Sequence, residues 1–172
     1  MIDNFILSNK RIYSFICISV FANAMGFFGF LYEEIDFIPN YFINPLNAKI
    51  HWNQFHVYTN PAHYHIIPSI VAIICLIALW FYNQNFSIVQ TKKLKIVSIN
   101  TVLINCITGI AVLFINNKLF FDEPVNNSQI LILLAVMWAI LNMMRLILLG
   151  LNIIYLMKFF QINLVLKGKN SD

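Results

Sequence analysis

All four histidines of the 172-residue chain lie in one short segment, HWNQFHVYTNPAHYH, at positions 51 to 65. A neutral imidazole can act as a general base near physiological pH, or as a ligand of a metal or haem. His56 and His63 are seven residues apart with Asn60 between them, so an unbroken helix would carry all three on one face. This spacing makes His56 and His63 the candidate catalytic residues, provided that the helix continues through Pro61.

The two other histidines, His51 and His65, would project elsewhere, and we expect His65 at the membrane interface. The chain has no HxxxH or HExxH pair, so a mononuclear metal motif is not indicated. Haem held by two histidines usually draws them from facing helices, whereas these histidines come from a single segment. We therefore predict no cofactor, and keep haem or a metal as the alternative. The competing interpretation is that the histidines are polar interface residues without a catalytic part.

A second group of chemically capable residues lies on one side of the last apolar run. At helical spacing this side carries Trp138, Asn142, Arg145 and Asn152. An arginine near the centre of a membrane helix costs about 2.5–3.5 kcal/mol, so its charge should be compensated. One interpretation is an internal pair with Glu33, Glu34 or Asp36, or hydrogen bonds to asparagines and helix carbonyls. The other is an anchor for an anionic or carbonyl-bearing ligand inside the protein.

Two further runs have a polar side. In the third run it carries Ser98, Thr101, Asn105 and Thr108, and in the first run Ser19, Asn23, Gly26 and Glu33. We expect the three polar sides to meet between the helices, where Asn105 becomes a candidate ligand contact. Ordinary hydrogen bonds between helices, worth about 0.6 kcal/mol each, explain the third run equally well. The predicted substrate-binding residues are Arg145, Asn142, Asn105, Trp138 and Asn60.

The composition requires a membrane around these residues. Hydrophobic residues make up 60% of the chain and charged residues 10%, and the mean hydropathy is +0.75. A soluble domain has about 25% charged residues, and so short a chain has no core that could bury this much apolar surface. The lipid bilayer is the expected partner, and the net charge of +4 needs no nucleic acid to explain it. Cys17, Cys75 and Cys106 lie in apolar runs without a CxxC pattern, and are expected to be buried thiols.

Four apolar runs are long enough to cross a hydrocarbon core, which takes about 20 helical residues. They are roughly Ile12–Tyr32, Ile66–Tyr82, Ile96–Ile115 and Ile130–Met157. No linker or repeat divides the chain, so residues 1–172 are expected to form a single four-span membrane domain. The first run contains an A-x-A signal-peptidase pattern at Ala22–Ala24, but the apolar stretch continues through Leu31, so we expect it to be uncleaved.

The charges predict the orientation of the spans. With a cytoplasmic N-terminus, the inner side carries Lys10, Arg11, Lys92, Lys93, Lys95, Lys158, Lys167 and Lys169. The outer side then carries Lys49 and Lys118 with Glu33, Glu34, Asp36, Asp122 and Glu123. This asymmetry follows the positive-inside rule and predicts the cytoplasmic membrane, with both termini in the cytoplasm and residues 33–65 on the outer face.

The outer segment should contain a helix of its own. Asn47 is a candidate cap for a helix that runs toward Tyr58, and Trp52, Tyr58 and Tyr64 are residues typical of membrane interfaces. Pro61 is expected to break or kink the chain before the second span. The predicted fold is all-α: an integral membrane antiparallel four-helix bundle with an outer interfacial helix before the second span.

The layout resembles a known family. The first span is rich in small residues (Ala22, Ala24, Gly26, Gly29), the outer segment contains Trp52 and Phe55, His63 and Pro68 open the second span, and two spans follow. This pattern resembles the anthrone-oxygenase-like family of small four-helix membrane proteins. The resemblance implies oxygenation of a lipophilic aromatic or carbonyl compound without a cofactor. His56 or His63 would remove a proton, the carbanion would react with dioxygen, and Arg145 or Asn142 would hold the oxyanion. The chain departs from the pattern in having no aligned acid partner for the histidine.

The leading hypothesis is therefore a lipophilic small-molecule site between the helices that opens to the outer face, in an oxygenase-like enzyme. The first alternative is a non-catalytic membrane subunit or assembly partner, in which the polar sides of the helices bind a second chain or another copy. A small transporter or channel fits less well, since the chain has neither an inverted repeat nor broken helices.

Overall fold

The computed structural model describes residues 2–56, 58, 61–120 and 127–168, and the described part of the chain is helical without strands. The elements are α1 (Ile2–Ile43), α2 (Pro45–Phe55), α3 (Pro61–Phe81), the 3-10 turn η1 (Asn83–Asn85), α4 (Ile88–Ile110), the π-helical η2 (Ala111–Asn116), α5 (Asn117–Leu119) and α6 (Ser128–Gly168). The predicted all-α class is confirmed.

Four helical segments are long and apolar enough to cross a membrane: Lys10–Ile43, His63–Phe81, Ile88–Leu119 and Ser128–Gln161. Large apolar side chains cover their outer surfaces. Phe21, Phe28 and Leu113, for example, are 66%, 64% and 70% exposed. A water-soluble monomer rarely exposes so much contiguous apolar surface, so this exterior suits lipid chains. The chain thus has the features of a multi-pass membrane protein.

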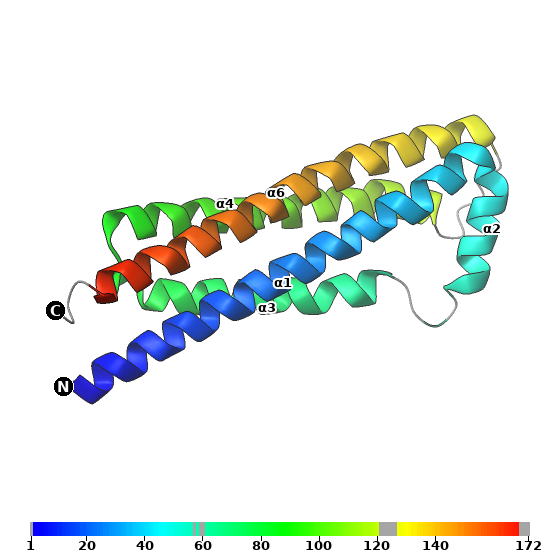
Figure 1. The fold of residues 1–172 in the computed structure, drawn as a ribbon. Helices are drawn as coiled ribbons and strands as arrows, with labels where there is room; N and C mark the ends of the chain where they lie inside the picture. Colours follow the sequence, from blue (N-terminus) through cyan, green and yellow to red (C-terminus); the bar gives the residue numbers. More distant parts are fainter. Residues whose placement is uncertain (1, 57, 59–60, 121–126, 169–172) are drawn as a thin grey trace.

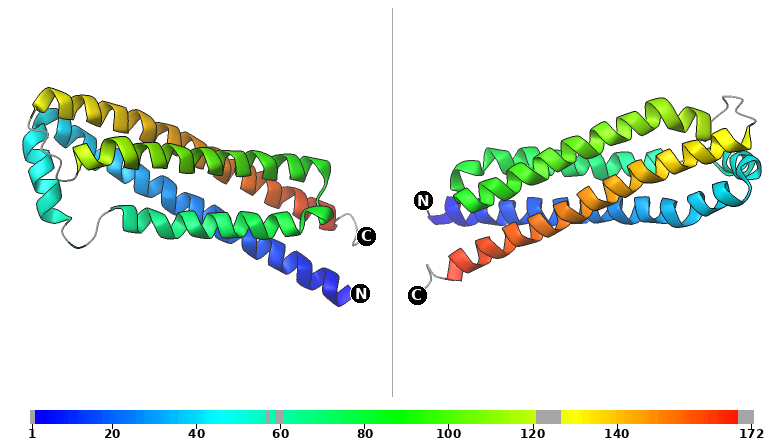
Figure 2. Two further views of the ribbon diagram at one scale, coloured as in Figure 1. Left: turned by 180° about the vertical axis from the view of Figure 1, so that it is seen from behind. Right: turned by 90° about the horizontal axis from the view of Figure 1, so that it is seen from above.

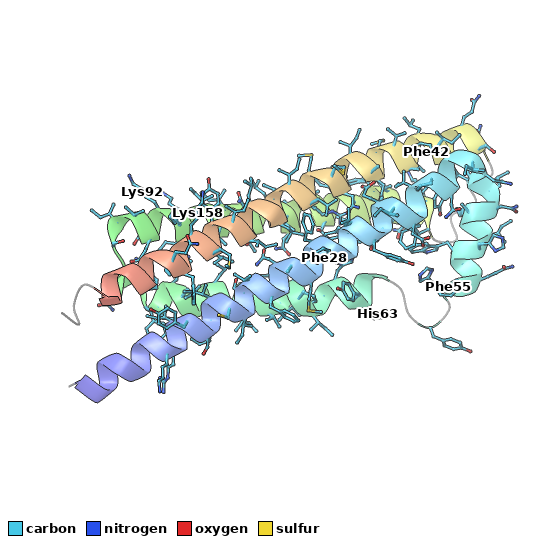
Figure 3. All side chains as sticks on the ribbon, in the orientation of Figure 1. Phe28, Phe42, Phe55, His63, Lys92 and Lys158 are labelled. Atoms are coloured by element: carbon cyan, nitrogen blue, oxygen red, sulfur yellow. The ribbon has the colours of Figure 1, made fainter. Side chains whose placement is uncertain are left out.

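The long helices lie side by side (Figures 1 and 2). α1 packs extensively against both α6 and α3, and α4 packs against α6, whereas α3 and α4 contact each other at few positions. Both termini lie at one end, and α2 lies across the other end (Figure 1). Lys92 and Lys158 are near the terminal end, and His63 and Phe55 are toward the α2 end (Figure 3). We call these the terminal end and the α2 end.

An aromatic core closes the α2 end. Phe37 and Tyr41 from α1 pack with Trp52 from α2, Phe120 after α5 and Trp138 from α6, and all five side chains are buried. The Trp52 ring lies 4.4 Å from Phe37 and 4.3 Å from Phe120, measured between ring centres. The Tyr41 hydroxyl donates a hydrogen bond of 2.9 Å to the carbonyl of Leu119. Trp52 is therefore buried in the core of the α2 end rather than exposed on its surface.

The outer helix differs from the prediction at both ends. Its cap is Asn44 rather than Asn47, because the Asn44 side chain accepts the backbone N–H of Asn47. α2 ends at Phe55, His56 and Tyr58 are not helical, and α3 begins at Pro61. A proline is well tolerated in the first turn of a helix, where its missing N–H costs nothing. The continuous helix on which the shared histidine face depended is therefore not formed.

The end of the first helix also changes where acidic residues lie. α1 continues helically to Ile43, well beyond the predicted end of the first span at Tyr32, and so places Glu33 and Glu34 where α1 packs against its neighbouring helices.

Of the cysteines, Cys75 is buried as expected, but Cys17 and Cys106 are exposed on the outer surface of the helices. The prediction of three thiols inside the protein is therefore wrong for two of them.

Candidate functional site

Arg145 is the centre of the buried polar chemistry. It projects from α6 and is only 4% exposed. Its guanidinium carbon lies 4.1 Å from the ring centre of Phe30 in α1 and 5.8 Å from that of Trp138. Both distances suit cation–π attraction, which strengthens when the cation is removed from water. Phe30 therefore provides the surface against which the arginine is held.

The same phenyl ring also carries a histidine. His65, from the first turns of α3, stacks on Phe30 with ring centres 4.0 Å apart and planes 11° apart. Its Nε2 lies 2.8 Å from Oε1 of Glu33, and both side chains are largely buried. With a proton on Nε2, the imidazole donates to the carboxylate and keeps a lone pair on Nδ1. His65 thus has an acidic partner, Glu33, on a neighbouring helix.

A glycine allows this contact between α1 and α3. A Cβ atom added at Gly29 would lie 2.5 Å from Cε1 of Tyr64 and 2.8 Å from Cε1 of His65. Any larger side chain at this position would displace the two rings. Tyr64 is held in place by a 3.1 Å hydrogen bond from its hydroxyl to the carbonyl of Met25. Gly29 thus permits a close approach of α3 to α1, whereas a Cβ atom added at Gly26 would have ordinary contact distances.

Asn142 and Glu34 complete the site. Asn142 is fully buried on α6, and its Nδ2 donates a 2.9 Å hydrogen bond to the carbonyl of Phe30. The Glu34 carboxyl group lies near the Asn142 amide and within the electrostatic influence of Arg145, which also interacts with Glu33. We call Phe30, Glu33, Glu34, His65, Asn142 and Arg145 the charged site. It joins three helices and contains two carboxyl groups, one guanidinium and one imidazole.

Several polar atoms of the charged site have no hydrogen-bond partner among the described residues. They are Nε and Nη2 of Arg145, Oε1 of Glu34, Oδ1 of Asn142 and Nδ1 of His65. An unsatisfied buried polar group costs about 1–3 kcal/mol, and more when it is charged. The site therefore combines two unused donors with several unused acceptors, which suits a bound group that can both accept and donate.

A second polar layer lies nearer the terminal end than the charged site does. Asn152 of α6 donates from Nδ2 to Oδ1 of Asn23 at 3.1 Å and to Oγ1 of Thr101 at 3.3 Å. Asn23 in turn donates to the carbonyl of Ser19 at 2.7 Å. These bonds tie α1, α4 and α6 together. The polar sides predicted for the first and fourth runs are thus buried and do meet.

The polar side of α4 behaves differently. Ser98, Thr101, Asn105 and Thr108 all donate to carbonyls of their own helix. Of these four residues, Thr101 is joined to the second polar layer, whereas Asn105 is exposed in a groove between α3 and α4. The predicted meeting of all three polar sides is therefore only partly realised, and Asn105 does not belong to the charged site.

The predicted histidines lie apart from Arg145. His56 follows the end of α2 and stacks on Trp52 with ring centres 3.9 Å apart. It lines a pocket of about 370 Å³ between α1 and α2, together with Asp36, Phe37, Asn40, His51 and others. His63 is exposed near the start of α3 (Figure 3), and Asn60 lies outside the described residues. Arg145, Asn142 and Trp138 come together as predicted.

Sequence reasoning missed His65. Its partner Glu33 is 32 residues away on another helix, and no spacing rule connects them. The available signal was Glu33 itself, an acidic residue on the polar side of the first run that needed a partner. A basic or imidazole group at the outer end of a neighbouring span was the natural candidate.

Within the described residues, no three His, Cys, Asp or Glu side chains come together in a way that could hold a metal ion. Comparison with known protein families, curated proteins and solved structures found no match to this chain. The oxygenase-like activity and the absence of a cofactor, both expected from the sequence, therefore stay predictions.

Proposed function

We propose that this chain is a protein of the cytoplasmic membrane whose outer half binds a small lipophilic molecule bearing a hydroxyl or carbonyl group. In this proposal the four apolar helices cross the bilayer as an antiparallel bundle. The terminal end, with Lys92 and Lys158, faces the cytoplasm, in agreement with the positive-inside rule. The charged site then lies in the outer half, between the α2 end and the centre of the bilayer.

The observation that carries the proposal is the buried arginine with two nitrogens unpaired among the described residues. Intramembrane ionisable groups are rare and usually functional, because lipid cannot solvate them. Two carboxyl groups near a single guanidinium disfavour an anionic ligand. A carbonyl or hydroxyl oxygen can instead accept from Arg145 without adding charge, and a hydroxyl proton can be donated to Glu34 or His65. These charges therefore favour an uncharged ligand with a hydroxyl or carbonyl group.

The pocket between α1 and α2 is the approach that we propose for this ligand, and opening it to the charged site requires the aromatic core at the α2 end to move. Its wall includes Phe37, Trp52 and His56. Phe37 follows Glu33 by one helical turn, so this part of the pocket wall is about 6 Å along α1 from the charged site. The aromatic lining suits a planar lipophilic compound. In this arrangement His56 contributes to the entrance.

The chemistry that we propose is removal of a proton from the bound ligand by Nδ1 of His65. The Nε2–Glu33 hydrogen bond orients the ring and stabilises the imidazolium that forms, while Arg145 stabilises the oxyanion. The catalytic roles expected for His56 and His63 remain predictions; we favour His65 because it is hydrogen-bonded to Glu33 and because its ring and the Arg145 guanidinium both pack on Phe30. A carbanion formed in this way is the species that reacts with dioxygen in the oxygenation expected from the family resemblance.

The test is mass spectrometry of compounds extracted from gently purified protein. Wild type is expected to carry one lipophilic compound with a hydroxyl or carbonyl group, and Arg145→Leu to retain roughly 10- to 100-fold less of it, because a hydrogen bond to a charged group is lost. Met144→Leu is the matched control, since Met144 neighbours Arg145 but is 46% exposed on the outside of α6.

Equal retention by Arg145→Leu would refute the site. A bound metal or haem would refute the cofactor-free chemistry. An empty wild-type protein that brings down a second chain would favour the non-catalytic subunit instead.

A further inference from the structure

The groove between α3 and α4 is the most open part of the helix pack. Although α3 and α4 are consecutive long helices, they touch at few positions. The space between them is about 570 Å³ and is bordered by Ile73, Ile77 and Trp80 on one side and by Thr101, Val102 and Asn105 on the other. Two side-chain hydrogen bonds cross it, from Trp80 to Ser98 at 2.9 Å and from Ser69 to Asn105 at 3.3 Å.

Asn105 is the unusual residue in this groove, because it is a polar and exposed side chain at membrane depth. At about 1.5 Å per residue, it lies roughly 25 Å along the helix from Ile88 and roughly 21 Å from Leu119, the ends of this apolar segment. A hydrocarbon core is about 30 Å thick, so Asn105 lies well inside it. Lipid chains offer no hydrogen bonds to such a group.

The amide of Asn105 retains unused bonding capacity. A carboxamide has two N–H donors and two acceptor lone pairs. One donor is used on the Thr101 carbonyl at 2.8 Å, and one lone pair accepts from Ser69. One donor and one lone pair therefore remain, and because the side chain is exposed they are accessible from outside the protomer. A group of this kind is complementary to another copy of itself.

We propose that the α3–α4 groove is the interface of a homodimer in which Asn105 of one protomer hydrogen-bonds to Asn105 of the other. A two-fold axis along the membrane normal places identical residues at identical depths. The Asn105 side chain of a second copy is therefore at the depth needed to bond to the first. Hydrogen-bonding side chains and close helix approach are what drives helix association in lipid, where the hydrophobic effect is absent. The apolar rims at Ile73, Ile77 and Val102 supply the surrounding packing.

The dimer goes beyond the proposed ligand site and does not depend on it. Asn105 and the groove lie outside the charged site, and Arg145 is buried between other helices. Dimerisation should therefore persist in Arg145→Leu, and ligand retention should not require Asn105. The failure of either proposal can be recognised separately.

Native cysteines provide the first test. Cys106 adjoins Asn105 and lines the groove, whereas Cys17 is exposed on α1, which does not line it. Mild oxidation of membranes that contain the wild-type protein is expected to give a covalent dimer. The dimer should disappear in Cys106→Ser and persist in Cys17→Ser. No dimer, or equal cross-linking through Cys17, overturns the proposal.

The association constant in liposomes, measured by energy transfer between labelled protomers, provides the second test. Asn105→Leu is expected to lower it by about an order of magnitude, because two symmetric interhelical hydrogen bonds are lost. Ser69→Ala is the matched control: it removes the bond between Ser69 and Asn105 within one protomer but leaves the outward atoms of Asn105 in place. A dimer that is insensitive to Asn105→Leu, or a monomeric wild type, refutes the interface.

Discussion

Replacing Gly29 by alanine tests the geometry of the charged site with a single methyl group. In an ordinary helix this change stabilises, because alanine exceeds glycine by about 1 kcal/mol in helix propensity. At Gly29 the new Cβ would lie 2.5 Å from Tyr64 and 2.8 Å from His65, so both rings must move. Overpacking of this kind costs about 1–3 kcal/mol. The net change in the free energy of unfolding should therefore lie between zero and a loss of about 2 kcal/mol.

The contacts of the two rings explain why they cannot move away from a new Cβ atom without a loss of stability. Tyr64 is anchored through its hydroxyl to Met25, and His65 is both stacked on Phe30 and hydrogen-bonded to Glu33. Moving His65 by the required fraction of an ångström lengthens its 2.8 Å contact with Glu33. Gly29→Ala should therefore also reduce retention of the bound compound that we propose.

Gly26 is the matched control on the same helix. A Cβ atom there would lie 3.5 Å from Leu149, which is ordinary contact. Gly26→Ala should gain up to about 1 kcal/mol from helix propensity. The assay is the free energy of unfolding in mixed micelles, titrated with denaturing detergent, together with the nitrogen NMR signals of the His65 ring. Equal stability of the two variants, with an unchanged His65 spectrum, would refute the close approach described above.

Two further predictions concern single contacts. Glu33→Leu should lower the free energy of unfolding by about 3–5 kcal/mol, because it breaks a largely buried pair. In a double-mutant cycle, Glu33→Leu combined with His65→Phe should lower it by less than the sum of the two single changes. Strictly additive changes would show that the 2.8 Å contact contributes no interaction energy. Asn44→Ala should lower the unfolding free energy by about 0.5–2 kcal/mol through loss of the α2 cap, whereas Asn47→Ala should change it little. The reverse order, measured by the same titration, would mean that the sequence-based choice of Asn47 was correct.

Local patterns predicted most of the secondary structure and part of the site. The four apolar segments and the buried polar sides of α1 and α6 were readable from helical spacing, because the position of a side chain around its own helix depends only on the 3.6-residue repeat. Arg145, Asn142 and Trp138 were found in this way, and so was the need for acidic compensation near Arg145. Their placement on one buried face required no knowledge of the other helices.

The contacts between helices were outside the reach of such patterns. Whether His65 meets Glu33 depends on how far α3 is shifted along α1 and how each helix is rotated, and the close approach at Gly29 is one of the contacts that determine both. The break between Phe55 and Pro61 separated His56 from His63, and the weak contact of α3 with α4 left Asn105 in an open groove. By itself the sequence determined which face of each helix is polar. The tertiary structure decided which polar faces meet, because register and rotation between helices are set by side-chain packing over the whole length of the contact.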